Sequence, residues 1–389
     1  MEIAVINRSS RILSGHLWVF SNELAQSPKR FLPGALVELC DRKNTFLGIG
    51  YVNPHSLISI RILTKDREEI DKGFFKKRIA GALEYRKRAV KDRSSFRAVY
   101  SESDLLPGLI VDKFGDCLSV QLLTLGMDVR SEMIIEALDE VLSPKTIVLR
   151  NDSSSRALEG IKLEKKIVKG EISHDKLPQI REGNIVLEVD PLAGQKTGFF
   201  LDQAENRALF GSLAGEGKGL DLFCYTGAWS VKMAEAGAKT TGVDSSEAAV
   251  EQAKRNAQIN SLSSKCLFIK ADVFDFAKEE LSKGSVYDFI VLDPPAFVKS
   301  KANLKEGLKA YRVMNSICMK LLRKGGLLAT SSCSFHVDRL TFLEILRSAA
   351  KDANRSSRII EVRSQAKDHP ISLQVPETEY LKCVIMEVG

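Results

Sequence analysis

Several features of common protein classes are missing from this chain. Its 389 residues include only five histidines and seven cysteines, and no two cysteines have the Cys-x-x-Cys spacing. This argues against a zinc ribbon and against a disulfide framework, and we predict no metal site. No apolar run approaches the roughly 20 residues that cross a bilayer, and the first residues lack the charged and apolar regions of a signal peptide. We therefore expect a cytoplasmic protein without membrane contact.

Positive charge is concentrated in one short part of the chain. The whole sequence carries a net charge of +7, and residues 73–100 alone contain nine basic and two acidic side chains. Phe75, Ile79 and Leu83 recur at helical spacing and Arg86 continues the series, which predicts an amphipathic helix. Its basic residues Lys76, Lys77, Arg86 and Arg88 form either a solvated face or a face that binds the phosphates of a nucleic acid. The sequence leaves both interpretations open.

The pattern of apolar residues predicts three domains. Residues 1–72 contain short strands over 34–39, 46–52 and 57–63, which suit a small β-barrel. Residues 73–185 combine the basic helix with a hairpin over 109–122, as in a small α+β domain. Residues 186–389 become regular from about position 217, where strands alternate with helices. Such a repeat predicts an α/β fold with a doubly wound parallel sheet.

The first strand of this repeat leads into a loop with a single glycine. The loop contains Phe223, Tyr225 and Gly227 and lacks the Gly-x-Gly-x-x-Gly run that admits a pyrophosphate. Asp244 and Asp272 follow the next two strands, although either aspartate taken alone is as well explained by helix capping. Together, carboxylates at successive strand ends favour a cationic ligand, and we predict S-adenosylmethionine as the cofactor.

Two further motifs directly follow short apolar runs that predict buried strands. Asp293-Pro294-Pro295-Ala296-Phe297 follows residues 289–292, and Ser331-Ser332-Cys333-Ser334 follows residues 327–330. Because ligands bind at the carboxyl ends of strands in open α/β sheets, both motifs are expected to face one crevice. Asp-Pro-Pro resembles the motif that many nucleic-acid methyltransferases place against a flipped base. We therefore expect Pro294, Pro295 and Phe297 to contact RNA.

Cys333 is the candidate nucleophile, although an isolated cysteine is by default a small buried hydrophobe. C5 of a pyrimidine is a poor nucleophile. A thiolate that adds to C6 makes C5 reactive enough to accept a methyl group, and later loss of the C5 proton releases the thiol. Asp293 would hold the base and stabilise charge that develops in the ring. The sequence does not identify the proton acceptor.

The whole chain resembles the ribosomal RNA large-subunit methyltransferase I family. The runs that carry the resemblance are Gly15–Glu23, Leu106–Asp112, Gly194–Gln203, Asp368–Pro370 and Glu379–Lys382. The resemblance implies an RNA-binding PUA barrel, a small central α+β domain and a Rossmann-like class I S-adenosylmethionine-dependent domain that methylates cytosine C5 in large-subunit (23S) ribosomal RNA. It also implies a cofactor pocket, suggests a homodimer and assigns the role of nucleophile to Cys333. The cofactor residues would be Phe223, Tyr225, Gly227, Asp244, Asp272, Asp293 and Lys196.

One position departs from the wider class of cytosine-C5 methyltransferases. Enzymes with two motif cysteines carry one directly after the Asp-Pro-Pro motif, where this chain has Ala296. A one-cysteine mechanism is therefore expected. Three alternatives remain: methylation of uracil C5, methylation of guanine N7, and a non-catalytic RNA-binding factor in ribosome assembly. Cys333 argues against guanine N7, which is already nucleophilic.

Overall fold

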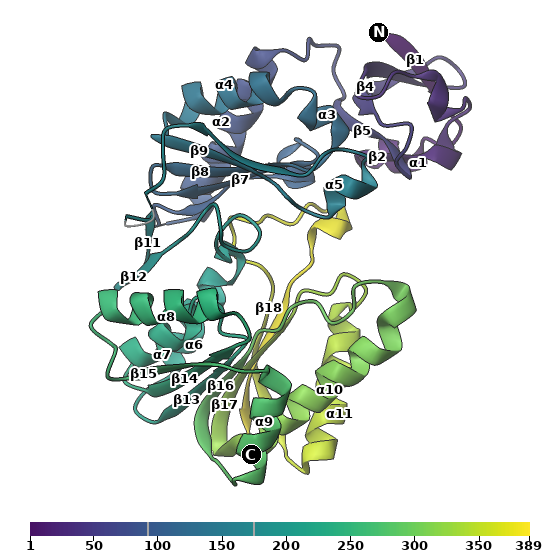
Figure 1. Cartoon of the computed structure of the whole chain (residues 1–389). Helices are drawn as coiled ribbons and strands as arrows, with labels where there is room; N and C mark the ends of the chain where they lie inside the picture. Colours follow the sequence, from purple (N-terminus) through teal and green to yellow (C-terminus); the bar gives the residue numbers. More distant parts are fainter. Residues whose placement is uncertain (92, 174–175) are drawn as a thin grey trace. The chain divides into compact units, whose positions relative to one another are not determined.

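The computed structural model describes residues 1–91, 93–173 and 176–389, which divide into two compact units. The first unit comprises Met1–Ile180, Val189–Leu201 and Lys367–Thr378. The second comprises Arg181–Glu188, Asp202–Ala366 and Glu379–Gly389. A segment near the C-terminus therefore belongs to the N-terminal unit, and the chain can be followed by colour in Figure 1.

The first unit begins with a five-stranded sheet in the order β1-β3-β4-β5-β2. Its strands are β1 (Glu2–Ile6), β2 (Trp18–Phe20), β3 (Leu36–Asp41), β4 (Phe46–Val52) and β5 (Ile58–Thr64), and α1 (Ser10–Leu13) lies between β1 and β2 in sequence. Val19, Phe31 and Leu39 are buried in its core, which Val375 of the C-terminal segment joins. The three strands predicted from the sequence are present as β3, β4 and β5.

A second five-stranded sheet follows in the same unit, in the order β10-β9-β8-β7-β6. Its strands are β6 (Phe96–Tyr100), β7 (Leu109–Phe114), β8 (Cys117–Leu122), β9 (Thr146–Asn151) and β10 (Glu164–Lys169). The helices of this region are α2 (Lys72–Ala89), α3 (Leu125–Asp128), α4 (Ser131–Leu142) and α5 (Ser155–Leu158). Helices α2 and α4 bury Phe75, Ile79 and Ile134 in one core with the sheet. The short strands β11 (Gln179–Glu182) and β12 (Ile185–Glu188) form a hairpin further along the chain.

The second unit contains a seven-stranded sheet in the order β15-β14-β13-β16-β17-β19-β18. Its strands are β13 (Lys218–Leu222), β14 (Lys239–Asp244), β15 (Cys266–Lys270), β16 (Tyr287–Leu292), β17 (Leu322–Ser332), β18 (Ser357–Arg363) and β19 (Lys382–Val388). Strands β13 to β17 are parallel, whereas β19 is antiparallel to both β17 and β18. The predicted doubly wound fold is confirmed. Its strand order reverses at β13, where such folds bind their ligands.

Alternating side chains of the central strands enter two separate cores, one on each face of this sheet. Leu222, Ile290 and Leu292 belong to one core, and Phe289 and Val291 belong to the other. The covering helices are α6 (Ala204–Leu213), α7 (Ala228–Glu235), α8 (Glu247–Ile259), α9 (Val273–Ser282), α10 (Leu304–Leu321) and α11 (Arg339–Ala353). Figure 1 shows α6–α8 on one side of the sheet and α9–α11 on the other. Burial on both faces explains why the parallel strands have nearly continuous apolar sequences.

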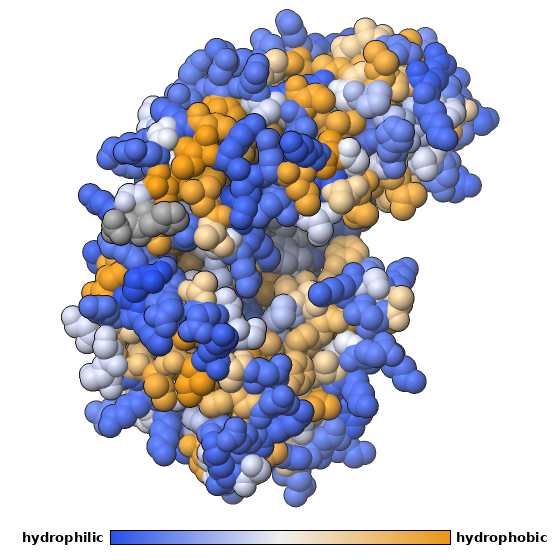
Figure 2. Space-filling model, viewed as in Figure 1, coloured by the Kyte–Doolittle hydropathy of each residue, from blue (hydrophilic) through white to orange (hydrophobic). Residues whose placement is uncertain are grey.

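Among the described residues, no helix is long and apolar enough to cross a lipid bilayer. The face of the molecule seen in Figure 2 is mostly hydrophilic, with apolar side chains in separated groups.

Candidate active site

The loop after β13 has a strained backbone. Phe223 and Tyr225 have φ angles of 66° and 47°, and Gly227 has a φ of 76°. Left-handed conformations are uncommon for residues other than glycine, and bulky residues adopt them only where the surrounding structure holds them. Here the backbone N–H groups of Phe223 and Cys224 both donate to the Val243 carbonyl at 3.0 Å. The three predicted cofactor residues of this loop therefore lie together at the switch point of the sheet.

Asp244 is oriented at the end of β14 by two backbone donors. One carboxylate oxygen accepts from Tyr225 N at 3.0 Å, and the other accepts from Ser246 N at 2.9 Å. Asp272 is exposed, and its carboxylate accepts from Asp275 N at 3.0 Å as the N-cap of α9. The capping function considered from the sequence is thus present at Asp272. Its role toward a cofactor stays a prediction.

Gly227 lies where a larger residue would not fit. A Cβ atom at this position would be 2.8 Å from the Ala253 Cβ and from the Phe268 ring. We expect Gly227→Ala to lower cofactor affinity by at least about tenfold and to destabilise the protein by about 1–3 kcal/mol, because both the φ angle and the contact must change. Gly284→Ala is the matched control, since Gly284 has a φ of 69° with no atom within 4 Å of the added Cβ.

Thermal unfolding and equilibrium dialysis of S-adenosylmethionine would measure these effects. The control isolates the cost of the left-handed backbone from the cost of the clash. Equal losses of cofactor affinity in the two variants would contradict the assignment of Gly227 to the cofactor loop.

A buried carboxylate behind this loop fits a cationic ligand. In Asp221, one carboxylate oxygen accepts from both the backbone N–H and the hydroxyl of Ser230, at 3.0 and 2.7 Å. The other oxygen is buried and has no hydrogen-bond partner among the described residues. Burial raises the pKa of Asp221 to about 7, with smaller contributions from the nearby carboxylates of Asp293 and Asp244. A pyrophosphate would be repelled here, whereas the ammonium and sulfonium of S-adenosylmethionine suit the site.

Asp293 follows β16 directly, and two side chains fix its carboxylate. Gln203 Nε2 donates to one oxygen at 2.9 Å, and Trp229 Nε1 donates to the other at 3.1 Å. Burial is the main cause that raises the pKa of Asp293 to about 6, and the neighbouring Asp202 carboxylate adds to it. A carboxyl group with this pKa changes its charge close to neutral pH. It is therefore suited to exchanging a hydrogen bond or a proton with a bound base.

Gln203 connects the two motifs. The same Nε2 group that donates to Asp293 also donates to Ser331 Oγ at 3.0 Å, and Asn206 Nδ2 donates to Gln203 Oε1 at 2.6 Å. The amide of Gln203 is thus held in one orientation with its N–H groups toward both strand ends.

Cys333 follows β17 directly and lies beside the Asp-Pro-Pro motif. Its Sγ atom is 4.0 Å from the Pro294 carbonyl oxygen. The next residue, Ser334, accepts from Val298 N at 3.1 Å through its hydroxyl, which also lies 2.9 Å from the Tyr311 hydroxyl. The structure therefore brings the two motifs together, as their positions at neighbouring strand ends predict. Cys333 is partly exposed, so a substrate atom can reach the thiol.

Lys382 is a charged neighbour of Cys333 that the sequence does not reveal. Its side chain is buried, with a residue exposure of 4%, and its Nζ donates to the Ser334 and Tyr380 carbonyls at 2.8 Å each. Lys382 lies opposite Ser332 in the pairing of β17 with β19. Burial lowers the pKa of Lys382 to about 8, and its attraction to Cys333 partly opposes this. No local motif indicates this contact, because it joins residues about fifty positions apart.

The remaining residues of the Asp-Pro-Pro motif differ in exposure. Pro294 is buried and Pro295 is exposed. The Phe297 ring lies 6.0 Å from that of Phe223 and 4.7 Å from that of Tyr311, centroid to centroid. Phe297 therefore lies between the cofactor loop and Tyr311, whose hydroxyl is 2.9 Å from Ser334 Oγ. Its contact with RNA stays a prediction.

Two aromatic side chains of this site were missed from the sequence. One is Trp229, the donor to Asp293. The other is Phe335, two residues beyond Cys333, which is 60% exposed although it is large and apolar. An exposed ring next to a candidate nucleophile is a surface on which a base can stack.

For the basic helix α2, the structure corrects the prediction made for Arg86. Arg86 has an exposure of 1%, and its guanidinium donates to Asp104 at 2.5 Å and to the carbonyls of Arg97 and Asp368 at 2.8 and 2.9 Å. The prediction that Arg86 binds RNA is therefore wrong, because its donors are used inside the first unit. Its helical spacing with Phe75 and Ile79 was the signal that could have indicated burial.

The lysines of α2 are partly or fully exposed and are mostly paired with carboxylates. Lys76 Nζ lies 2.6 Å from a Glu140 carboxylate oxygen, and Lys77 Nζ lies 3.4 Å from one of Glu68. Arg88 is exposed. Exposed ion pairs contribute about 0–1 kcal/mol and can be exchanged for a phosphate, so these three residues remain candidates for RNA binding.

Lys196 lies in the first unit with a φ of 51°. Its ammonium is 4.7 Å from the centroid of the Phe200 ring. Its proposed place over the cofactor stays a prediction.

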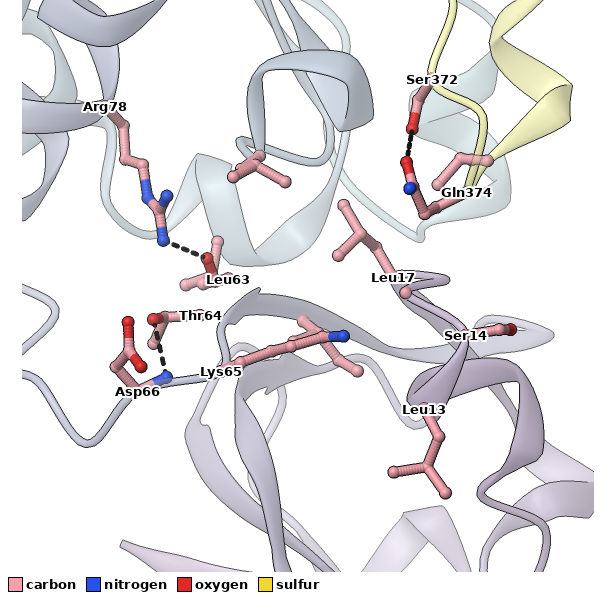
Figure 3. A pocket seen from close by; sticks show the side chains of 14 residues that line it. Leu13, Ser14, Leu17, Leu63, Thr64, Lys65, Asp66, Arg78, Ser372 and Gln374 are labelled. Carbon is pink, nitrogen blue, oxygen red and sulfur yellow. Dashed lines mark hydrogen bonds between the residues drawn. The ribbon is translucent and has the colours of Figure 1, made fainter.

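A pocket of about 440 Å³ lies in the first unit. As Figure 3 shows, Leu13 and Leu17, Lys65 and Asp66, and Arg78 line it from different elements, together with Ser372 and Gln374 of the C-terminal segment. Arg78 donates to the Leu63 carbonyl at 3.2 Å. None of the predicted catalytic or cofactor residues is among its lining residues, so this pocket is separate from the candidate active site.

Comparisons with known proteins support both the N-terminal barrel and the α/β fold of the second unit. A PUA-like domain model matches residues 7–65, and a methyltransferase domain model matches residues 215–375. The chain is 37% identical over 386 residues to the ribosomal RNA large subunit methyltransferase I of Pseudoalteromonas atlantica, with 98% of this chain and 97% of that protein covered. The protein of the same name from Tolumonas auensis is 37% identical over 385 residues, with 98% and 97% covered.

A solved structure extends the similarity of fold to the full length. The crystal structure of a candidate methyltransferase complexed with SAH superimposes with a TM-score of 0.86, at 20% identity and with 100% of both chains covered.

Proposed function

Because the chain belongs to the ribosomal RNA large subunit methyltransferase I family, we propose that it methylates C5 of a cytosine in large-subunit (23S) ribosomal RNA, with S-adenosylmethionine as the methyl donor. The observation that carries the proposal is the position of Cys333. A partly exposed thiol lies at the end of β17, beside the Asp-Pro-Pro motif and next to a buried lysine. That is the arrangement a covalent mechanism at C6 requires.

The cofactor would be held by the loop after β13 and by the carboxylates around it. Phe223, Tyr225 and Gly227 shape the loop, and Asp244 ends the neighbouring strand. Asp221 lies buried on β13 and is hydrogen-bonded to Ser230. S-adenosylmethionine supplies an electrophilic methyl group on a sulfonium when it is bound.

The chain's own residues would then act on the base. The Cys333 thiolate forms a bond to C6, and the electrons of the C5=C6 double bond move to make C5 nucleophilic. After C5 is methylated, loss of its proton returns electrons to the C5–C6 bond, and the C6–S bond breaks to release the thiolate. Ala296 leaves Cys333 as the sole cysteine of the two motifs.

Lys382 supports the thiolate form of Cys333. An ammonium group held on the Ser334 carbonyl lies next to the residue that must become an anion. In a site with low solvent access, a neighbouring positive charge favours the thiolate and lowers the pKa of the thiol. The buried ammonium is in turn favoured by the thiolate, so the two groups stabilise each other's charged forms.

Asp293 supports recognition of cytosine. Its two oxygens accept from Gln203 and Trp229, which fix the plane of the carboxyl group at the strand end. Because its pKa is raised to about 6, it can become protonated and donate to N3 of cytosine, which is an acceptor. In uracil N3 carries a hydrogen, so the ionised carboxylate would be needed instead. The predicted barrel of residues 1–72, of which residues 7–65 match the PUA-like model, would bind RNA as well. A homodimer stays a prediction.

Trapping of the covalent adduct tests the function. In RNA that contains 5-fluorocytosine at the target position, fluorine replaces the C5 proton. The enzyme therefore cannot remove that proton to release the thiol, and it is expected to remain attached through Cys333. A gel shift that survives denaturant, followed by mass spectrometry of the Cys333 peptide, would detect the adduct.

Matched RNAs separate the alternatives. RNA with 5-fluorouracil at the same position should trap the enzyme poorly. Preferential trapping by this RNA would indicate that the target base is uracil rather than cytosine. Methylated guanine in wild-type product RNA, without any adduct, would support the guanine-N7 alternative. Failure to bind S-adenosylmethionine would support a non-catalytic factor.

A further inference from the structure

A row of lysines directly follows the Asp-Pro-Pro motif. Lys299 lies in the loop after Phe297, Lys301 lies in the short 3₁₀ turn Lys301–Asn303, and Lys305 and Lys309 lie in the first turns of α10. We call Lys299, Lys301, Lys305 and Lys309 the lysine row. All four side chains are exposed. Residues 299–309 contain four lysines against one glutamate, a net charge of +3.

The charges of the lysine row are not neutralised. Within the part of the chain that the structure describes, none of the four forms an ion pair with a carboxylate. Glu306, three residues before Lys309, also forms no ion pair with any of them. The lysines of α2 differ, because Lys72 and Lys76 share Glu140 and Lys77 pairs with Glu68. The lysine row is therefore ready to bind an anion without first giving up a carboxylate.

Spacing places two of these lysines on one side of α10. Lys305 and Lys309 are four residues apart in this helix, and side chains at this spacing lie on the same helix face. Lys305 and Lys309 are separated by about 6 Å along the helix axis. In a stacked strand, successive nucleotides rise by about 3.4 Å, and two steps span about 6.8 Å. Lysines about 6 Å apart can therefore contact alternate phosphates of one strand.

The lysine row is fixed relative to the catalytic loops. Gly307 of α10 lies against the motif loop, since a Cβ there would be 2.4 Å from Val298 Cγ2. Asn303 Nδ2 donates to the Phe297 carbonyl at 3.0 Å. The hydroxyl of Tyr311, also in α10, lies 2.9 Å from Ser334 Oγ, next to Cys333. Helix α10 thus carries Lys305 and Lys309 and also contacts Ser334, the residue after Cys333.

We propose that the lysine row binds the backbone phosphates of the RNA strand that flanks the target nucleotide. The proposal deepens the proposed function and rests on it. A base must leave its stack to reach Cys333, and the strand on either side must be held while it does so. Phosphate contacts position a strand without reading its sequence. This is a task for flexible lysines rather than for the fixed carboxylate of Asp293 and the fixed amide of Gln203.

The test compares two quadruple variants. Lys299→Gln, Lys301→Gln, Lys305→Gln and Lys309→Gln remove the lysine row. Lys218→Gln, Lys239→Gln, Lys320→Gln and Lys324→Gln remove the same charge from exposed positions of the same unit, near the amino ends of its strands and the end of α10. The probe is a single-stranded 20-nucleotide RNA with one 5-fluorocytosine, and affinity is measured from about 50 to 200 mM salt.

Each phosphate neutralised on a single strand contributes about 0.7 to the slope of log K against log salt, so loss of the lysine row should reduce the slope by about 2 to 3. The control should keep a slope close to that of wild type, and both variants should bind S-adenosylmethionine normally. An unchanged slope in the first variant, or an equal loss in the control, would overturn the proposal. If the slope falls as expected but wild-type enzyme forms no adduct, the lysine row still binds RNA and the proposed function fails.

Discussion

Replacing Cys333 with alanine is expected to reduce methyl transfer by about four to six orders of magnitude, as in other enzymes that lose a covalent nucleophile. The thiol is the group that makes C5 reactive, and its neighbours offer no second sulfur because Ala296 occupies the other motif position. The affinity for S-adenosylmethionine should change by less than about twofold, since the cofactor loop follows a different strand from Cys333. Single-turnover transfer of labelled methyl to RNA measures the first quantity, and equilibrium dialysis measures the second.

Cys266→Ala is the matched control for this variant. Cys266 is the other partly exposed cysteine among the described residues, and it lies at the start of β15, whereas Cys333 follows the end of β17. The control should retain wild-type activity and the adduct with 5-fluorocytosine RNA. A Cys333→Ala variant that methylates at more than about one hundredth of the wild-type rate would exclude the covalent mechanism.

Replacing Lys382 with methionine is expected to slow alkylation of Cys333 at pH 7 by about tenfold or more, which corresponds to a rise of at least about one unit in the pKa of the thiol. The ammonium is held next to Cys333 in the wild type, and methionine fills a similar volume without the charge. Iodoacetamide labelling of the Cys333 peptide from pH 6 to 10, followed by mass spectrometry, measures the effect without RNA. It therefore reports on the thiol even if methyl transfer depends on other steps.

The pH at which Lys382 acts follows from its own pKa. Burial lowers this pKa to about 8, so the stabilising ammonium is present below pH 8 and is lost as the pH rises through that value. The rates of wild type and Lys382→Met should therefore differ most near neutral pH and converge above it. Lys382→Arg, which stays charged, should keep rapid labelling at higher pH. Identical profiles for wild type and Lys382→Met would show that the lysine only fills space.

The free energy of unfolding should also depend on the ionisation of Lys382, and it should increase with pH. The folded protein binds the proton of Lys382 less tightly than the unfolded chain, whose lysine has a pKa near 10.5. The cost of burying the ammonium is therefore present below about pH 8 and is relieved as the pH rises from there toward 10.5. Lys382→Met should lack this gain in the free energy of unfolding.

The sequence predicted those parts of the site that depend on local pattern. The apolar runs before Asp293 and Cys333 were strands because short runs without helical periodicity fit a buried parallel sheet. Pro294 and Pro295 ended one strand because proline cannot continue a central ladder. The same reasoning placed Gly227 and Asp244 at one edge of the sheet. Each of these inferences needed only neighbouring residues and the rule that parallel strands end at a common edge.

Prediction from the sequence failed where the environment of a side chain depended on residues far along the chain. Arg86 was grouped with exposed lysines by composition, yet its position on the buried face of α2 lets it bond to Asp104 and to carbonyls far along the chain. Trp229 and Gln203 were not linked to Asp293, although they fix its carboxylate. Such contacts have no spacing rule, because they form only after helices and strands have packed.

The sequence by itself determined the chemistry available to this protein: a thiol and a carboxylate at neighbouring strand ends, and a glycine loop suited to a cationic cofactor. Local patterns specify strands, turns and the residues at their ends, so this much could be inferred directly. The tertiary structure decided which charged side chains are free to bind RNA or to influence the Cys333 thiol. It buried Arg86, placed Lys382 beside Cys333 and left the lysine row unpaired, because burial and ion pairing depend on which distant groups meet when the chain packs.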